Sequence, residues 1–186
     1  MKEEWLFYFD AGTGKTMAKG IVIGVLLTLV GGILGAYLFV VLGFMPANAD
    51  GKPGFLETWA AHKSLRATLE REAPAGPNPT VLTDSHLIDG IRLYSMNCAV
   101  CHGFSDAKAS NIAMGLFQRA PQLAEHGVED DPDGVPFWKI KHGIRLTGMP
   151  GFSHTLTDEQ IWEITLFLKH MDSLPPAPRR VWKALP

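Results

Sequence analysis

The chain has 186 residues, a net charge of −2 and 46% hydrophobic residues, and it contains two cysteines. This length has room for one domain with accessory segments, and the near-neutral charge gives no basis for binding nucleic acid. Two cysteines also exclude a zinc site built from two cysteine pairs.

An uncharged run at residues 21–45 follows an N-terminal segment, residues 1–19. As a helix, the run would extend about 37 Å, which is enough to cross the roughly 30 Å hydrocarbon core of a bilayer. We therefore predict a single transmembrane helix over residues 20–45. Small residues recur at every fourth position, which favours close packing against a partner helix: Gly20, Gly24, Thr28, Gly32 and Ala36.

This span is either a retained anchor or a cleaved signal. Ala47-Asn48-Ala49 resembles a cleavage site, but the apolar run is longer than the roughly 7–15 residues of a signal peptide, which favours an anchor. Lys15 and Lys19 precede the span, whereas only Lys52 follows it closely. This asymmetry predicts a cytoplasmic N-terminus.

Residues 46–80 are predicted to form a linker on the far side of the membrane. It contains apolar residues at helical spacing, which predict a short amphipathic helix over Phe55–Glu72: Phe55, Trp59, Leu65 and Leu69. Such a helix would lie on the membrane surface, on the following domain or on a partner. The proline-rich stretch 73–80 is a semi-rigid connector.

The most informative motif is Cys98-Ala99-Val100-Cys101-His102, which matches the haem attachment signature C-x-x-C-H. Two thiols at this spacing can form thioethers with the two vinyl groups of one porphyrin, and the next imidazole reaches the iron from the same side. Cys98 and Cys101 are therefore predicted to hold one covalent haem c, with His102 as an iron ligand. Because bacteria attach this haem outside the inner membrane, the haem domain is expected on the periplasmic side.

Two other interpretations of C-x-x-C fit less well. A zinc site needs four ligands, and the chain has no second cysteine pair. A thiol–disulfide oxidoreductase site would follow a strand in a βαβ unit, whereas the residues before Cys98 have a helical pattern.

Helices are predicted on both sides of the haem motif, within a domain that covers residues 81–174. Thr83 or Asp84 can cap a helix from about residue 85 to residue 97. Thr157 and Gln160 form a capping box at the start of the last helix. Its apolar positions indicate a buried face: Ile161, Ile164, Leu168 and Met171.

The second iron ligand can be methionine, histidine or an open position. Met149 stands out because the surrounding Thr147–Phe152 stretch contains Gly and Pro, which favour an extended loop that can cross the haem face. Met171 fits core packing and Met114 lies in a flexible stretch. The remaining histidines are expected to be exposed or locally bonded: His126, His142, His154 and His170.

The stretch from about residue 81 to residue 174 resembles the class I monohaem cytochrome c domain. Five segments match that family in order: Gly90-x-x-x-Tyr94, the haem motif at 98–102, Ala120-Pro121-Gln122-Leu123, the methionine loop at 143–152 and the helix start at 156–162.

The resemblance implies an all-α, class I cytochrome c fold around one covalent haem, preceded by the single transmembrane helix. It implies His102 and Met149 as axial iron ligands, and a hydrogen bond from the His102 imidazole to the carbonyl of Pro121. With both axial positions filled, no substrate chemistry is expected at the iron. Three further residues are candidates to line the haem or meet its propionates: Trp138, Arg145 and Phe152.

The sequence does not decide the role of two further segments. Residues 103–136 are long for this kind of domain and contain an acidic run at 129–133, which indicates a solvated surface loop or, alternatively, a docking loop. Residues 175–186 form a proline-rich tail, in which Trp182 is a possible anchor on a partner.

The predicted function is electron transport by a single-pass protein of the bacterial inner membrane, rather than catalysis. It would be a subunit or a tethered partner of a respiratory or photosynthetic membrane redox complex, which it would contact through the transmembrane helix and the haem edge: a quinol-oxidising complex, a terminal oxidase or a reaction centre. The alternatives are a haem-based sensor or peroxidase-like enzyme with a labile sixth ligand, and a membrane-bound thiol–disulfide oxidoreductase that uses Cys98 and Cys101.

Overall fold

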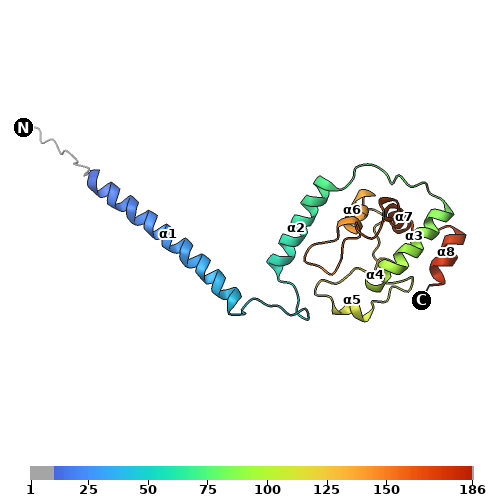
Figure 1. Ribbon diagram of the computed structural model, residues 1–186, viewed down its shortest axis with the longest axis horizontal. Coiled ribbons are helices and arrows are strands. Elements are labelled where there is room, and N and C mark those ends of the chain that lie inside the picture. Colours follow the sequence, from blue (N-terminus) through green and yellow to red (C-terminus); the bar gives the residue numbers. More distant parts are fainter. Residues whose placement is uncertain (1–10, 186) are drawn as a thin grey trace, which may run out of the picture. The chain divides into compact units, whose positions relative to one another are not determined.

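A computed structural model describes residues 11–185, with side chains described from residue 16. The regular elements in this range are all helices, which confirms the all-α prediction. In chain order they are α1 (Ala11–Val41), α2 (Phe55–Glu72), α3 (Asp84–Asn97), α4 (Ala99–His102), α5 (Asn111–Gly115), α6 (Gly134–His142), α7 (Asp158–Lys169) and α8 (Pro176–Lys183) (Figure 1). The chain divides after Asn48 into two compact units.

The first unit contains one long helix, α1. From Gly20 to Val41 it carries no Asp, Glu, Lys or Arg, and its side chains are exposed. Within the described range it is the one helix long and apolar enough to cross a membrane. It begins at Ala11, before the predicted start at residue 20, and ends at Val41, before the predicted end at residue 45. Residues 1–10 of the predicted N-terminal segment lie outside the described range.

The helices α3 and α7 begin at the capping residues that the sequence indicates. The hydroxyl of Thr83 accepts a hydrogen bond from the backbone N–H of His86, 3.2 Å away. Thr157 and Gln160 form a reciprocal capping box, in which each side chain accepts from the other residue's backbone N–H, at 3.3 and 3.0 Å. These bonds satisfy amide groups that have no partner inside the first helical turn.

The core of the second unit lies where α3 crosses α7. A Cβ atom at Gly90 would lie 2.2 Å from the carbonyl oxygen of Glu163, so only glycine allows the two backbones to approach this closely. The crossing packs fully buried side chains of α3 against those of α7: Leu87, Ile91 and Tyr94 on α3, with Ile161, Ile164 and Phe167 on α7.

The C-terminal segment is part of this core rather than a tail. Residues Pro176–Lys183 form α8, and its Trp182 is only 5% exposed. The Trp182 ring meets Tyr94 and Phe167 edge to face, with ring centroids 5.6 and 5.0 Å apart. The domain predicted to end at residue 174 therefore continues through α8, and Trp182 is anchored within its own chain.

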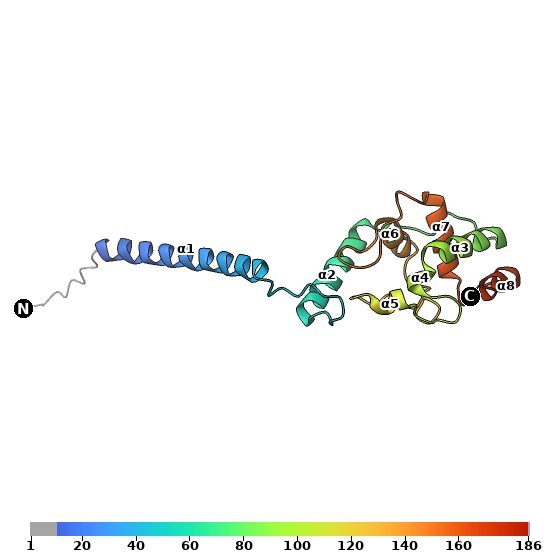
Figure 2. The same ribbon diagram turned by 60° about the horizontal axis from the view of Figure 1, so that its bottom comes forward.

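The linker helix α2 has the predicted bounds and packs on the domain that contains the Cys98–His102 motif. Its half-buried residues Leu65 and Leu69 line a groove together with Val135 and Lys139 of α6. Figures 1 and 2 show α2 on the side of this unit opposite α8. From α2 onward, the linker predicted at residues 46–80 is thus a part of the folded unit.

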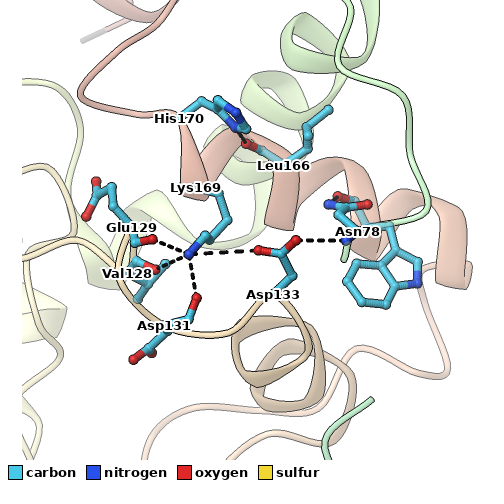
Figure 3. A network of polar contacts seen from close by, with 9 residues as sticks. Asn78, Val128, Glu129, Asp131, Asp133, Leu166, Lys169 and His170 are labelled. Atoms are coloured by element: carbon cyan, nitrogen blue, oxygen red, sulfur yellow. Dashed lines mark hydrogen bonds and ion pairs between the residues drawn. The ribbon is translucent and has the colours of Figure 1, made fainter. Parts of the chain in front are cut away.

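The acidic run at 129–133 folds around the half-buried ammonium group of Lys169 (Figure 3). Lys169 Nζ donates to the carbonyl oxygens of Val128, Glu129 and Asp131, and it lies 3.8 Å from the Asp133 carboxylate. The same carboxylate accepts a hydrogen bond from the backbone N–H of Asn78, at 2.7 Å. Residues 128–133 of the predicted surface loop are therefore held in place, because their carbonyl dipoles compensate the charge of Lys169.

We expect Gly90→Ala to lower the free energy of unfolding by about 2–3 kcal/mol, because the added methyl group forces α3 and α7 apart. Chemical denaturation of the full chain, followed by tryptophan fluorescence, measures the change. Gly115→Ala is the matched control, since a Cβ there meets no atom within 4 Å, and it should change stability by less than about 1 kcal/mol. Equal effects of the two substitutions would contradict the close crossing.

We expect Lys169→Met to lower the free energy of unfolding by about 2–3 kcal/mol, because the carbonyl groups of the 128–131 loop lose a charged donor. The Lys169 side chain is only 14% exposed, so water does not replace it fully. Lys108→Met, which removes an exposed lysine paired with Asp106, should stay within about 0.5 kcal/mol. Hydrogen exchange should also quicken in residues 128–133 of the Lys169 variant alone. Unchanged exchange there would show that the lysine does not hold the loop.

Candidate functional site

The haem motif occupies a single tight turn at the end of α3. Cys98 follows α3 directly and precedes the short helix α4, in which the backbone N–H groups of Cys101 and His102 both donate to the carbonyl of Cys98, at 3.0 and 2.9 Å. The two cysteines form no disulfide with each other, and both are half-buried. The two sulfur-bearing side chains and the imidazole are thus delivered together by the helix that crosses α7.

The environment of Cys98 does not favour thiol–disulfide chemistry. Burial, and secondly the neighbouring Cys101, raise the pKa of the Cys98 thiol to about 12. A redox-active cysteine depends instead on a lowered pKa that supplies thiolate near neutral pH. The geometry therefore favours a pair of thiols that serve as attachment points.

The His102 ring has the protonation state of a metal ligand. Its Nδ1 lies 2.9 Å from the carbonyl oxygen of Pro121. Because a carbonyl only accepts, Nδ1 carries the proton and Nε2 keeps its lone pair. Burial lowers the pKa of His102, and the bond to Pro121 opposes that effect in part. The ring is neutral at pH 7, and the Pro121 carbonyl fixes its orientation, as a carbonyl or carboxylate usually does for a ligating histidine.

Three side-chain and backbone contacts hold the segment that carries Pro121. Gln122 Nε2 donates to the carbonyls of Cys101 and Ala120, at 3.0 and 3.2 Å, and the Leu123 N–H donates to the carbonyl of His102 at 3.1 Å. The Gln122 Oε1 atom is buried without a hydrogen-bond partner. Sequence reasoning identified Pro121 but missed Gln122, because the contacts of Gln122 join residues about twenty positions apart.

Tyr94 links the helix crossing to the haem motif. Its hydroxyl donates to the carbonyl of Gly103 at 2.9 Å and to that of His102 at 3.2 Å. Its ring packs on Phe167 and Trp182. The sequence pattern marked Tyr94 as a core residue only, so the second role of its hydroxyl was not anticipated.

Met149 lies in a closed loop between α6 and α7. The backbone N–H of Ile144 donates to the Met149 carbonyl at 3.1 Å, and the Met149 N–H donates to the hydroxyl of Thr147 at 3.1 Å. Gly143 has φ of +69°, and a Cβ there would lie 2.6 Å from the backbone of Pro150 and Gly151. The ends of the loop therefore meet, and the half-buried Met149 side chain packs against the same core cluster as Cys98.

The loop also meets the segment that follows the haem motif. A Cβ at Gly148 would lie 2.5 Å from a side-chain carbon of Leu116, which follows α5 directly. The short helix α5 contacts α4 in turn. The methionine loop and the haem motif are therefore connected through α5, a helix that sequence reasoning did not predict.

The remaining predicted pocket residues have different surroundings. Phe152 is half-buried and packs against the core. Trp138 on α6 is half-buried, with its ring centroid 4.9 Å from that of His142. Arg145 is exposed on the methionine loop. Of the four candidate pocket residues, Pro121 is the one that the structure joins directly to His102.

The donor set fits a covalent haem. Two thiols share one helical turn, the adjacent imidazole is neutral with Nε2 available, and one thioether is carried by a pinned loop. These are the groups that attach a haem c and ligate its iron. A structural zinc site would need further thiolate or imidazole ligands.

We expect Tyr94→Phe to lower the free energy of unfolding by roughly 1–2 kcal/mol, because the buried carbonyl of Gly103 loses its donor. Chemical denaturation of the full chain measures the loss. Tyr37→Phe is the matched control, since Tyr37 is exposed on α1, and it should have an effect within about 0.5 kcal/mol. If both variants were as stable as the parent chain, the Tyr94 hydroxyl would not be holding the haem motif.

Comparison with known proteins agrees with this geometry. Residues 87–168 match the family described as cytochrome c oxidase, cbb3-type, subunit III. The chain is also 28% identical over 82 residues to cytochrome c6 of Parathermosynechococcus lividus, an alignment that covers 44% of this chain and 86% of that protein. Residues 87–168 therefore belong to a class I monohaem cytochrome c domain, which carries one covalently attached haem c and is preceded by an N-terminal apolar helix.

Proposed function

We propose that this protein is a membrane-anchored electron carrier, not an enzyme in its own right, with Cys98 and Cys101 as the haem thioethers and His102 and Met149 as the axial iron ligands. The observation that carries the proposal is the state of His102, whose Nδ1–H donates to the Pro121 carbonyl oxygen, 2.9 Å from Nδ1, so that Nε2 is free to bind iron. When bound, the haem supplies one-electron exchange between ferric and ferrous iron.

The residues of the chain keep both proposed ligands in place. Tyr94, Gln122 and Leu123 restrain the motif on the His102 side. The closed loop from Gly143 to Phe152 restrains Met149. A thioether ligand favours the reduced iron and raises the reduction potential. Pro121, Trp138, Arg145 and Phe152 are proposed to complete the haem surroundings.

The proposed location is the bacterial inner membrane, with α1 as a single-pass anchor, the N-terminus in the cytoplasm and the haem domain on the periplasmic side. The length and apolar character of α1 support anchoring. The proposed partner is a membrane redox complex: a quinol-oxidising complex, a terminal oxidase or a reaction centre. Of these, the cbb3-type oxidase subunit named by the matching family favours an oxidase or an adjacent respiratory complex.

We expect Met149→Leu to abolish the methionine–iron charge-transfer band of the oxidised protein, because leucine has no donor atom. The reduced variant should also bind carbon monoxide rapidly, whereas the parent protein should not. Absorption spectroscopy of the purified full chain in detergent measures both properties.

Two other methionines provide matched controls. Met114→Leu, at an exposed position of α5, and Met171→Leu, in the core, should both retain the band. A parent protein without the band, or one that binds carbon monoxide rapidly, would contradict the carrier proposal and favour a haem sensor or a peroxidase-like enzyme.

A further inference from the structure

The helix α2 has two halves with different surroundings. Its second half packs on the haem domain, where Leu65 and Leu69 line the groove shared with α6. Its first half has apolar side chains that no part of the described chain covers: Phe55 is 81% exposed, Leu56 is 74% exposed and Trp59 is 55% exposed. One helix thus carries both a docked face and a free apolar end.

The free end is fixed to the haem domain because the two halves belong to one continuous helix. α2 is unbroken from Phe55 to Glu72, and its start is closed by the Glu57 carboxylate, which accepts a hydrogen bond from the backbone N–H of Gly54 at 3.4 Å. The helix contacts α6, within the same compact unit as the haem motif. Whatever binds Phe55, Leu56 and Trp59 therefore also orients the haem domain.

The chemistry of this end fits the interface of a bilayer. Tryptophan and phenylalanine bury their rings at the boundary between headgroups and acyl chains, where lysines meet lipid phosphates. Lys52 and Lys63 are exposed cations on either side of the cluster. The span α1 ends at Val41, and the connection at residues 42–54 can extend at most roughly 45 Å. Phe55 therefore lies within roughly 45 Å of the end of the span, which is close enough for it to reach the membrane surface.

We propose that Phe55, Leu56 and Trp59 insert into the headgroup region of the bilayer. α2 would then be a second membrane contact that holds the haem domain in one orientation, instead of leaving it to swing on a flexible linker. The inference rests on the proposed membrane anchoring by α1. The competing occupant, an apolar surface on another protein subunit, is an outcome of the test below.

The test is photo-crosslinking of the full chain in its native membranes, which contain both lipids and potential protein partners. Phe55→p-benzoylphenylalanine and Trp59→p-benzoylphenylalanine are made separately, because both positions are exposed and either substitution keeps an aromatic ring. Met96→p-benzoylphenylalanine is the matched control, since Met96 is an apolar residue on α3 that is 70% exposed. Haem content shows that each variant is folded.

We expect the variants at 55 and 59 to gain the mass of a phospholipid, and the variant at 96 to gain none. Adducts at 55 and 59 with another protein would overturn the proposal in favour of a subunit interface. No adduct at either position, or equal lipid adducts at all three, would overturn it as well. Two measurements recognise a failure of anchoring by α1 separately. Intact mass shows whether the chain has kept its span, and an alkaline wash shows whether the chain is released from the membrane.

Discussion

The approach of α3 to α7 at Gly90 is the constraint on which the rest of the haem domain depends. Because no side chain separates Gly90 from the Glu163 carbonyl, the two helices bury a continuous apolar face between them. One turn later, this contact places Tyr94 against Phe167 and Trp182. The same tyrosine uses its hydroxyl to hold the backbone at His102 and Gly103. The packing of the core and the position of the haem motif therefore have a common origin.

The site itself combines a rigid turn with two restrained loops. The turn from Cys98 to His102 belongs to the helical crossing, whereas Pro121 and Met149 come from segments with little regular structure. Hydrogen bonds compensate for that irregularity: Gln122 and Leu123 bind back to the motif, and the methionine loop closes on itself. Such preorganisation suits a proposed electron carrier, because both proposed ligands, His102 and Met149, would need to stay in place while the charge on the iron changes.

The domain is also connected to the chain that precedes it. Lys169 gathers the carbonyls of the 128–131 loop, and Asp133 continues this network to the backbone of Asn78. Asn78 in turn donates to the carbonyl of Trp162 on α7. Because α2 packs beside α6, the orientation of α2 and the orientation of the haem domain are coupled. This rigidity is what gives a membrane contact at the start of α2 its proposed consequence for the haem.

Local patterns were sufficient for much of the fold and for the centre of the site. The spacing of Cys98, Cys101 and His102 is imposed by the porphyrin, and the caps at Thr83 and Thr157 are bonds within one helical turn, so each is readable from adjacent residues. The match of Gly90-x-x-x-Tyr94 to the cytochrome c family indicated the helix that carries the motif, and the extended loop around Met149 followed from its Gly and Pro residues. The length of the apolar run was enough to indicate α1, although the helix begins and ends several residues before the predicted bounds.

The tertiary structure decided the features that depend on distant neighbours. The proline-rich segment after residue 175 becomes α8 because Tyr94 and Phe167 offer a surface for Trp182. The acidic run at 129–133 is held in place because Lys169 lies beneath it. Gln122 is indistinguishable from a surface glutamine until the chain brings it beside Cys101. In each case the stabilising partner is far away in sequence, so the sequence by itself determined which groups were available and only folding decided which of them meet.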